Sequence, residues 1–231
     1  MPVFFFCDKY CMVDLREHIK YMQSQENVGC CTASAVLLAA EIMSAKVGKT
    51  LNLSRLFVYY MTRKLQGRLG QKGAELKSTF DALSQYGVCK EQFWPFNYQR
   101  VDHEPSVMAI QNAHYKINGY ENVNPSDFNS LLDRGIPVVI GMHTGKLFWN
   151  IKGELHEQAY GPINDTNNRL SKGHAVTIVG YNNEIQGGSW IIANSLGLRW
   201  GYRGCGILPY SCHVDIGESY VIRNFAGLSA E

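Results

Sequence analysis

The chain has 231 residues, of which 45% are hydrophobic and 18% are charged, and its formal net charge is +2. This composition excludes a disordered or collagen-like chain, and a chain of this length buries roughly 70% of its unfolded surface without help from a metal or a disulfide. The balanced charge gives no reason to expect a nucleic acid or an anionic membrane as partner. We therefore expect a single domain over 1–231.

The N-terminal segment does not have the features of an export signal. The run Phe4-Phe5-Phe6 is followed at once by Cys7 and Asp8, and no basic region precedes it. No segment of the chain approaches the roughly 20 apolar residues needed to cross a bilayer. The seven cysteines are an odd number, so at least one is unpaired within the chain. Without an export signal, we expect reduced thiols and a cytoplasmic location.

Three helices are expected in the first half of the chain. Ten of the thirteen residues over 33–45 are apolar, so this helix should be buried on all sides. Ser54 is placed to cap a second helix that runs to Leu65. A third helix is expected over 74–86, with Gly87 at its end.

The second half of the chain has the pattern of β-strands. Short apolar or β-rich runs predict strands over 136–142, 175–181, 190–193 and 220–222. The polar stretch 145–171 is expected to be a loop. Together these elements predict an α+β fold in which a mainly helical lobe, about 13–112, precedes a mainly antiparallel β lobe, about 113–225.

Cys31 stands where an irregular, Gly-containing stretch meets the apolar helix. The N-terminus of a helix carries about half a positive charge, which favours a thiolate and predicts a lowered pKa for this cysteine. A buried structural cysteine is the commoner role beside an apolar helix. His174 at the start of a strand and Asn194 after another are also weak signals singly. In this order, the three are typical of a thiol nucleophile with an imidazole partner.

These residues resemble the papain-like cysteine peptidases, the papain and cathepsin group. In that group a cysteine near the mature N-terminus is followed by a histidine and an asparagine about 130–150 residues later. Here His174 lies 143 residues after Cys31, and Asn194 lies 163 residues after it. Gln25 stands six residues before the cysteine, where the family has a glutamine. The stretch 194–197 is similar to the family's Asn-Ser-Trp-Gly.

The resemblance implies a papain-like two-lobe fold, with a helical lobe, an antiparallel β-barrel-like lobe and the active-site cleft between them. It implies a cysteine endopeptidase with Cys31 as nucleophile and His174 as its acid–base partner. Asn194 would hold the imidazole, and Gln25 would stabilise the oxyanion together with the backbone N–H of the nucleophile. The expected partner is a peptide or protein substrate, the default state is a monomer, and no metal or cofactor is expected.

The resemblance also implies a set of substrate-binding residues: Gly73, Ala74, Glu75, Leu76 and Gly173. The first two stand where the family presents a Gly-Gly backbone edge to the peptide. Glu75 follows, where the wall of the second substrate pocket usually begins, and our hypothesis is that it makes this pocket tolerant of a basic or polar side chain. The alternative is a solvated residue that stabilises the start of a helix.

The chain departs from the family pattern at several positions. Thr32 replaces the tryptophan that usually follows the nucleophile. Leu196 replaces the tryptophan that shields the His–Asn hydrogen bond, so this bond should be shielded less well. Val28 and Gln71 stand where the family has two half-cystines, which fits a reducing compartment. Only 30 residues precede Cys31, so we expect no inhibitory pro-segment, a feature that looks more microbial or viral than lysosomal.

Two other functions remain open from the sequence. An acyl transferase on the same scaffold would pass the acyl group to an amine or a thiol instead of water. A catalytically inactive peptide-binding module would have no chemical need for all four of the residues Cys31, His174, Asn194 and Gln25. Their joint presence therefore favours the peptidase.

Overall fold

The computed structural model describes residues 11–158, 160, 161 and 172–226. The N-terminal run 1–10 and the part 162–171 of the expected loop lie outside the described residues. The α-helices are α1 (Cys31–Lys46), α2 (Arg55–Leu65), α3 (Leu76–Tyr86), α4 (Val107–Gln111), α5 (Phe128–Asp133) and α6 (Lys146–Trp149). The strands are β1 (Met12–Asp14), β2 (Tyr120–Asn122), β3 (Val138–Thr144), β4 (Lys172–Asn182), β5 (Ser189–Ala193), β6 (Cys205–Pro209) and β7 (Ile216–Ile222).

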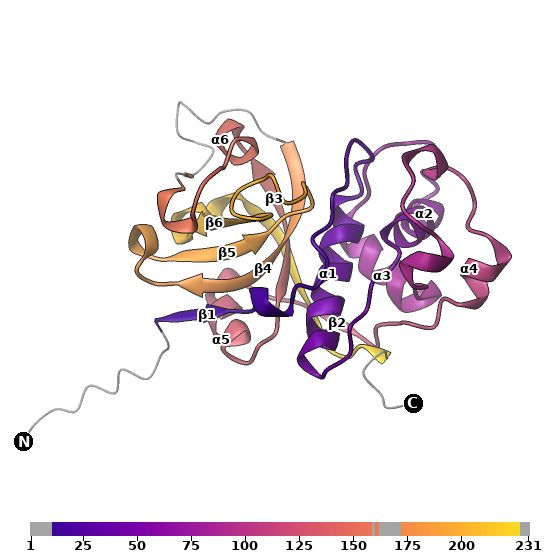
Figure 1. Ribbon diagram of the computed structural model, residues 1–231, viewed down its shortest axis with the longest axis horizontal. Helices are drawn as coiled ribbons and strands as arrows, with labels where there is room; N and C mark the ends of the chain where they lie inside the picture. Colours follow the sequence, from indigo (N-terminus) through magenta and orange to yellow (C-terminus); the bar gives the residue numbers. More distant parts are fainter. Residues whose placement is uncertain (1–10, 159, 162–171, 227–231) are drawn as a thin grey trace, which may run out of the picture.

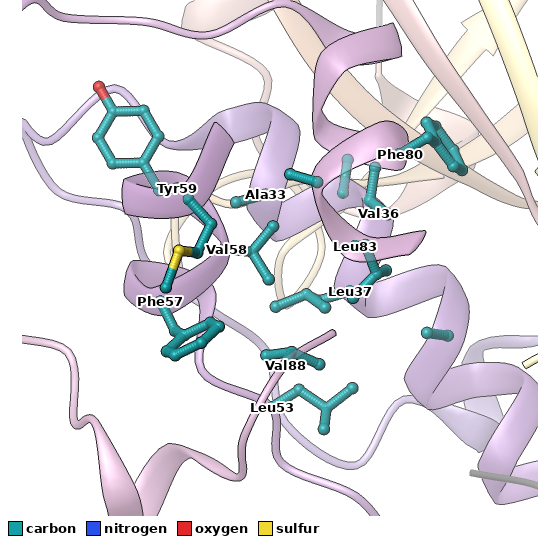
Figure 2. Packing of buried hydrophobic residues seen from close by; sticks show 14 of the residues in the cluster. Ala33, Val36, Leu37, Leu53, Phe57, Val58, Tyr59, Phe80, Leu83 and Val88 are labelled. Atoms are coloured by element: carbon teal, nitrogen blue, oxygen red, sulfur yellow. The ribbon is translucent and has the colours of Figure 1, made fainter. Parts of the chain in front are cut away.

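Helix α1 lies between the sheet and the other long helices (Figure 1). As its composition predicts, nearly all of its residues are buried. Val36 and Leu37 pack against α2 and α3 in the helical lobe, as Figure 2 shows, whereas Leu38 and Ile42 belong to the core of the sheet. The helix therefore joins two hydrophobic cores. Among the described residues, no helix is both long and apolar enough to span a membrane.

The ends of α2 and α3 follow the expected signals closely. The backbone N–H of Phe57 donates a 3.2 Å hydrogen bond to Ser54 Oγ, which caps α2. Helix α3 begins at Leu76, two residues later than expected, and Gly87 follows it with a φ of +72°. A Cβ atom on this glycine would lie 2.4 Å from the carbonyl oxygen of Ala113. The turn after α3 therefore requires glycine.

The sheet is antiparallel, with the strand order β2-β7-β3-β4-β5-β6 and β1 added against β4. The four expected strands correspond to β3, β4, β5 and β7, and the barrel-like lobe takes the form of a sheet that is not closed. Strand β4 pairs with both β3 and β5, so it lies inside the sheet. Strand β1, which precedes all the helices in the chain, also lies in this lobe (Figure 1).

The expectation of a loop over 145–171 was wrong at its start, because α6 forms there. Phe148 of this helix is fully buried, and its ring centroid lies 5.2 Å from that of Trp200. The indole N–H of Trp200 donates a 3.0 Å hydrogen bond to the Phe148 carbonyl oxygen. Four residues are too few for a helical period to be seen in the sequence. A helix this short is also unstable on its own, so tertiary contacts of this kind stabilise it.

Candidate active site

A cleft of about 540 Å³ opens where the N-terminus of α1 meets the first residues of β4. Residues from both lobes line it: Cys31, Thr32, Gly73, Ala74, Glu75, Leu76, Gly141, Met142, His143, Gly173, His174, Ala175, Gly217 and Glu218. The expected nucleophile, the expected histidine and all five expected substrate-binding residues are among them. Segments that are far apart in the sequence are thus brought together at one surface.

The packing of α1 on β4 explains why Cys31 and His174 share this cleft. The hydroxyl of Thr177 on β4 donates a 2.9 Å hydrogen bond to the carbonyl oxygen of Ala35 on α1. Ala35 lies one helical turn after Cys31, and Thr177 lies three residues after His174. This contact therefore sets the first turn of the helix beside the first residues of the strand.

Asn194 reaches His174 because β5 returns antiparallel to β4, with Ala193 opposite Thr177. The Nε2 atom of His174 lies 2.8 Å from Asn194 Oδ1. An amide oxygen can only accept a hydrogen bond, so we assign the proton of the neutral ring to Nε2. Nδ1 is then the basic nitrogen that can take a proton from a thiol. Both side chains are buried.

Gln25 is held in place by the residue next to Asn194. The Ser195 hydroxyl donates a 2.5 Å hydrogen bond to Gln25 Oε1, and the Gln25 backbone N–H donates to the Ser195 carbonyl oxygen at 2.7 Å. These bonds fix the orientation of the Gln25 amide, and they leave its Nε2 as the group that can donate to a ligand. Sequence reasoning assigned no role to Ser195, although it is part of the motif.

Aromatic side chains from α6 cover the histidine. Strand β3 places Met142 opposite His174, and α6 follows β3 directly. The His174 ring centroid lies 5.5 Å from that of Phe148 and 5.1 Å from that of Trp149. Although Leu196 replaces the usual tryptophan, His174 is only 5% exposed. The imidazole is thus well shielded, and the shield comes from a helix that was expected to be a loop.

The electrostatics of the pair are set mainly by burial. Burial raises the pKa of the Cys31 thiol, and backbone N–H groups, first that of Ala175, offset this only in part. Burial lowers the pKa of His174, and its hydrogen bond to Asn194 opposes this shift. The backbone N–H groups of Cys31 and Thr32 at the helix N-terminus do lower the pKa of Cys31, as expected, but burial outweighs them, so the net shift in the free cleft is upward. In the free cleft, both shifts favour the neutral forms of the two groups.

Glu218 on β7 also lines the cleft, and sequence reasoning missed it. It pairs with Gly141 of β3, which has no side chain to block the approach of the carboxylate. The only sequence signal for β7 was the short run 220–222, which left Glu218 outside the expected strand. Trp149 was missed for a similar reason, since it lies in the stretch that was expected to be a loop.

The described residues contain no group of three or more histidine, cysteine, aspartate or glutamate side chains that could hold a metal ion. Within the same part of the chain, the cysteines are all free. Cys30, beside the expected nucleophile, is fully buried in the core of the helical lobe. Burial raises its pKa to about 12. Of these two adjacent thiols, only Cys31 lines the cleft.

Comparisons with known proteins find sequences and structures similar to this chain. Xylellain, a cysteine protease from Xylella fastidiosa, has a similar structure, with a TM-score of 0.81 and 27% identity over 94% of this chain and 87% of that one. A peptidase C1-like protein of Acanthamoeba polyphaga mimivirus is 26% identical over 87% of this chain and 70% of its own length. Zingipain-2 of Zingiber officinale is 27% identical over 83% of this chain and 84% of its own length.

Some relatives are much longer than the part that matches. Peptidase 1 of Euroglyphus maynei is 26% identical over 65% of this chain, and the match covers only 46% of that protein. The family model described as papain family cysteine protease matches residues 11–220. This match covers most of the sequence, including both sides of the cleft, and the chain therefore belongs to the papain family of cysteine proteases.

Proposed function

We propose that this chain is an endopeptidase that cleaves peptide bonds through a covalent thioester on Cys31. The observation that carries the proposal is the 2.8 Å contact between His174 Nε2 and Asn194 Oδ1, on a histidine that lines the same cleft as the thiol. This contact leaves Nδ1 as the base. A buried histidine with no chemical task would not need to share a cleft with a thiol at the start of a helix.

In the first half of the reaction, His174 Nδ1 takes the thiol proton, and the sulfur of Cys31 attacks the carbonyl carbon of the substrate. An S–C bond forms, and the π electrons of the carbonyl move to its oxygen. The Gln25 amide and the backbone N–H of Cys31 at the helix start stabilise this oxyanion. The C–N bond then breaks, and His174 gives its proton to the leaving amine.

In the second half, water attacks the thioester. His174 takes a proton from the water, the C–S bond breaks, and His174 gives this proton to the leaving sulfur. The peptide acid is released, and the thiol of Cys31 and the neutral imidazole are restored. Asn194 keeps the imidazole in one orientation through both halves, because its amide oxygen is itself fixed by the backbone N–H of Ser195 at 2.8 Å.

The direct test is covalent labelling with a peptide that carries a thiol-directed epoxide, followed by mapping of the adduct by mass spectrometry. We expect selective modification of Cys31 and loss of this modification in His174→Ala, because the thiol has a raised pKa and needs its base. Equal labelling of Cys31 and the exposed Cys11 would contradict the proposal. Product analysis with an added amine acceptor distinguishes hydrolysis from acyl transfer.

Trp149→Ala is expected to shift the acid limb of the kcat/KM profile to higher pH. Burial is the main cause that lowers the pKa of His174, and removal of the indole lets water reach the imidazole, so this pKa should rise toward its ordinary value of 6.5. The measurement is kcat/KM from pH 4 to 9 for the wild type, Trp149→Ala and the control Trp149→Phe. An unchanged acid limb in Trp149→Ala would show that the indole does not control the environment of His174.

Glu75 and Glu218 are expected to favour a basic side chain in the substrate, because both carboxylates line the cleft. Glu75 is exposed and accepts a 3.1 Å hydrogen bond from Ser78, while Glu218 is half-buried. Ion pairs at such sites contribute at most about 1 kcal/mol, so Glu75→Leu or Glu218→Gln should lower the preference for Arg over Leu by up to about fivefold. Peptide pairs that differ at one position measure this ratio.

Glu184→Gln is the matched control for these two variants, since Glu184 is exposed and lies outside the cleft. If Glu75→Leu keeps the wild-type ratio and Glu218→Gln does not, Glu75 acts only at the start of α3. If neither ratio changes, the proposed preference for basic side chains is wrong.

A further inference from the structure

Tyr59 on α2 makes a contact that the reaction steps above do not use. Its side chain is fully buried, and Figure 2 shows its hydroxyl pointing away from the other labelled side chains of the core. This hydroxyl donates a 3.3 Å hydrogen bond to the carbonyl oxygen of Val28 and accepts a 2.9 Å hydrogen bond from the backbone N–H of Gly73. One oxygen atom thus joins two loops that are 45 residues apart in the sequence.

The two loops carry different parts of the site. Val28 lies in the segment between Gln25 and Cys31, and Gly73 belongs to the edge that we expect to bind the peptide backbone. The loops are also packed directly together. A Cβ atom on Gly29, whose φ is +79°, would lie 3.6 Å from the Gly73 nitrogen and 3.9 Å from the Tyr59 hydroxyl oxygen. The Tyr59 hydroxyl therefore bridges the catalytic loop and the peptide-binding edge at the place where the two loops pack together.

A buried guanidinium supports the tyrosine from the next turn of α2. Arg63 lies with its guanidinium carbon 4.1 Å from the centroid of the Tyr59 ring. It donates hydrogen bonds to the carbonyl oxygen of Gln71 at 3.2 Å and to Asp102 Oδ1 at 2.6 Å, and a further one to the Val101 carbonyl oxygen. Asp102 Oδ1 also accepts from the Gly70 N–H at 3.3 Å. Gly70 and Gln71, which shortly precede Gly73, are thus connected to α2 through Arg63.

We infer that Tyr59 is a positioning residue for substrate binding, which holds the peptide-binding edge at Gly73 in register with the catalytic loop, and that Arg63 and Asp102 support it. This inference rests on the proposed peptidase function. It predicts an effect that depends on substrate length. Only a substrate long enough to reach Gly73 uses the positioned edge, whereas a single-residue ester uses Cys31, His174 and the oxyanion donors alone.

The test is steady-state kinetics of Tyr59→Phe on a peptide with at least three residues before the cleaved bond and on a single-residue nitrophenyl ester. Loss of the hydroxyl leaves the Gly73 N–H without its acceptor, which should raise KM for the peptide by about tenfold. Because Ser195 still holds Gln25, kcat for the peptide and kcat/KM for the ester should change less than about twofold. Tyr60→Phe is the matched control, since it removes the hydroxyl of the next residue of α2, another buried tyrosine, which does not line the cleft.

A second variant, Asp102→Ala, weakens the support of the same loop at a half-exposed side chain and leaves the tyrosine itself unchanged. It should raise KM for the peptide in the same direction by a smaller factor. Unchanged KM for the peptide in both variants, or equal losses on peptide and ester, would overturn the inference. If the wild type cleaves neither substrate, the peptidase proposal fails instead. Hydrogen exchange at Gly73 then decides. Faster exchange in Tyr59→Phe, but not in Tyr60→Phe, supports the coupling, and unchanged exchange in Tyr59→Phe refutes it.

Discussion

His174→Ala is expected to lower kcat/KM for peptide hydrolysis by about 10⁴-fold while the protein stays folded. The imidazole has two tasks in the proposed reaction, because it takes the thiol proton and then protonates the leaving amine. Burial raises the pKa of Cys31, so without a base very little thiolate exists near neutral pH. The measurement is kcat/KM on one peptide for the wild type, His174→Ala and Cys31→Ser.

Asn194→Ala should show a smaller loss, because it removes the group that orients the ring and keeps the base itself. The hydrogen bond from His174 to Asn194 raises the histidine pKa, so its removal should also move the acid limb of the profile of kcat/KM against pH to lower pH.

His156→Ala is the matched control for His174→Ala, since this exposed histidine lies outside the cleft. Retention of more than a tenth of the wild-type rate in His174→Ala would mean that another group is the base.

Much of the helical lobe could be predicted from local signals alone. The apolar composition of α1 predicts burial on all sides, and Ser54 and Gly87 mark an end of α2 and of α3 because each satisfies a local backbone need. The strands β1, β2 and β6 could not be found in this way. They are three to five residues long and are stabilised by their partners in the sheet, as β1 is by its pairing with 180–182 of β4.

The residues of the candidate site could be predicted from the sequence, but their burial and their neighbouring side chains could not. The order of Cys31, His174 and Asn194 in the chain indicated a thiol site, and the structure places the first two in one cleft with the third bonded to the histidine. The sequence did not show which side chains surround these three residues in the fold. The cover from Trp149 and the hydroxyl of Tyr59 depend on long-range packing, and the same burial reverses the expected pKa shift of the thiol.

Burial has a second large consequence, for stability, at Glu41 on α1. This carboxyl group is buried in the interior, where Oε1 accepts a 2.7 Å hydrogen bond from the backbone N–H of Leu53. Burial raises its pKa to about 8, Glu91 adds to the rise, and the Leu53 N–H and Arg55 oppose it. A rise from 4.5 to about 8 corresponds to a cost of roughly 5 kcal/mol for the ionised form in the folded state.

The sign of the pH dependence follows from linkage. Below pH 4.5 the carboxyl is protonated in both the folded and the unfolded chain, so it carries no cost. Between pH 4.5 and about 8 only the unfolded chain ionises, and the free energy of unfolding therefore falls as the pH rises. Glu41→Gln keeps an amide oxygen for the Leu53 N–H and cannot ionise. Its stability relative to the wild type should therefore increase by roughly 4 kcal/mol from pH 4.5 to pH 8.5.

Urea unfolding of both proteins across this pH range measures the difference. The comparison between variant and wild type cancels the titration of groups that do not interact with Glu41, and it leaves the titration of Glu41 together with its coupling to Glu91, whose pKa burial also raises. Since the amide N–H₂ group that the Glu41→Gln substitution introduces has to find a partner, this variant can be less stable than the wild type at pH 4.5. Only the slope of the difference against pH tests the argument. In Glu184→Gln, where the carboxylate is exposed, this slope should be close to zero, and an equally flat slope in Glu41→Gln would mean that Glu41 is solvated in the folded protein.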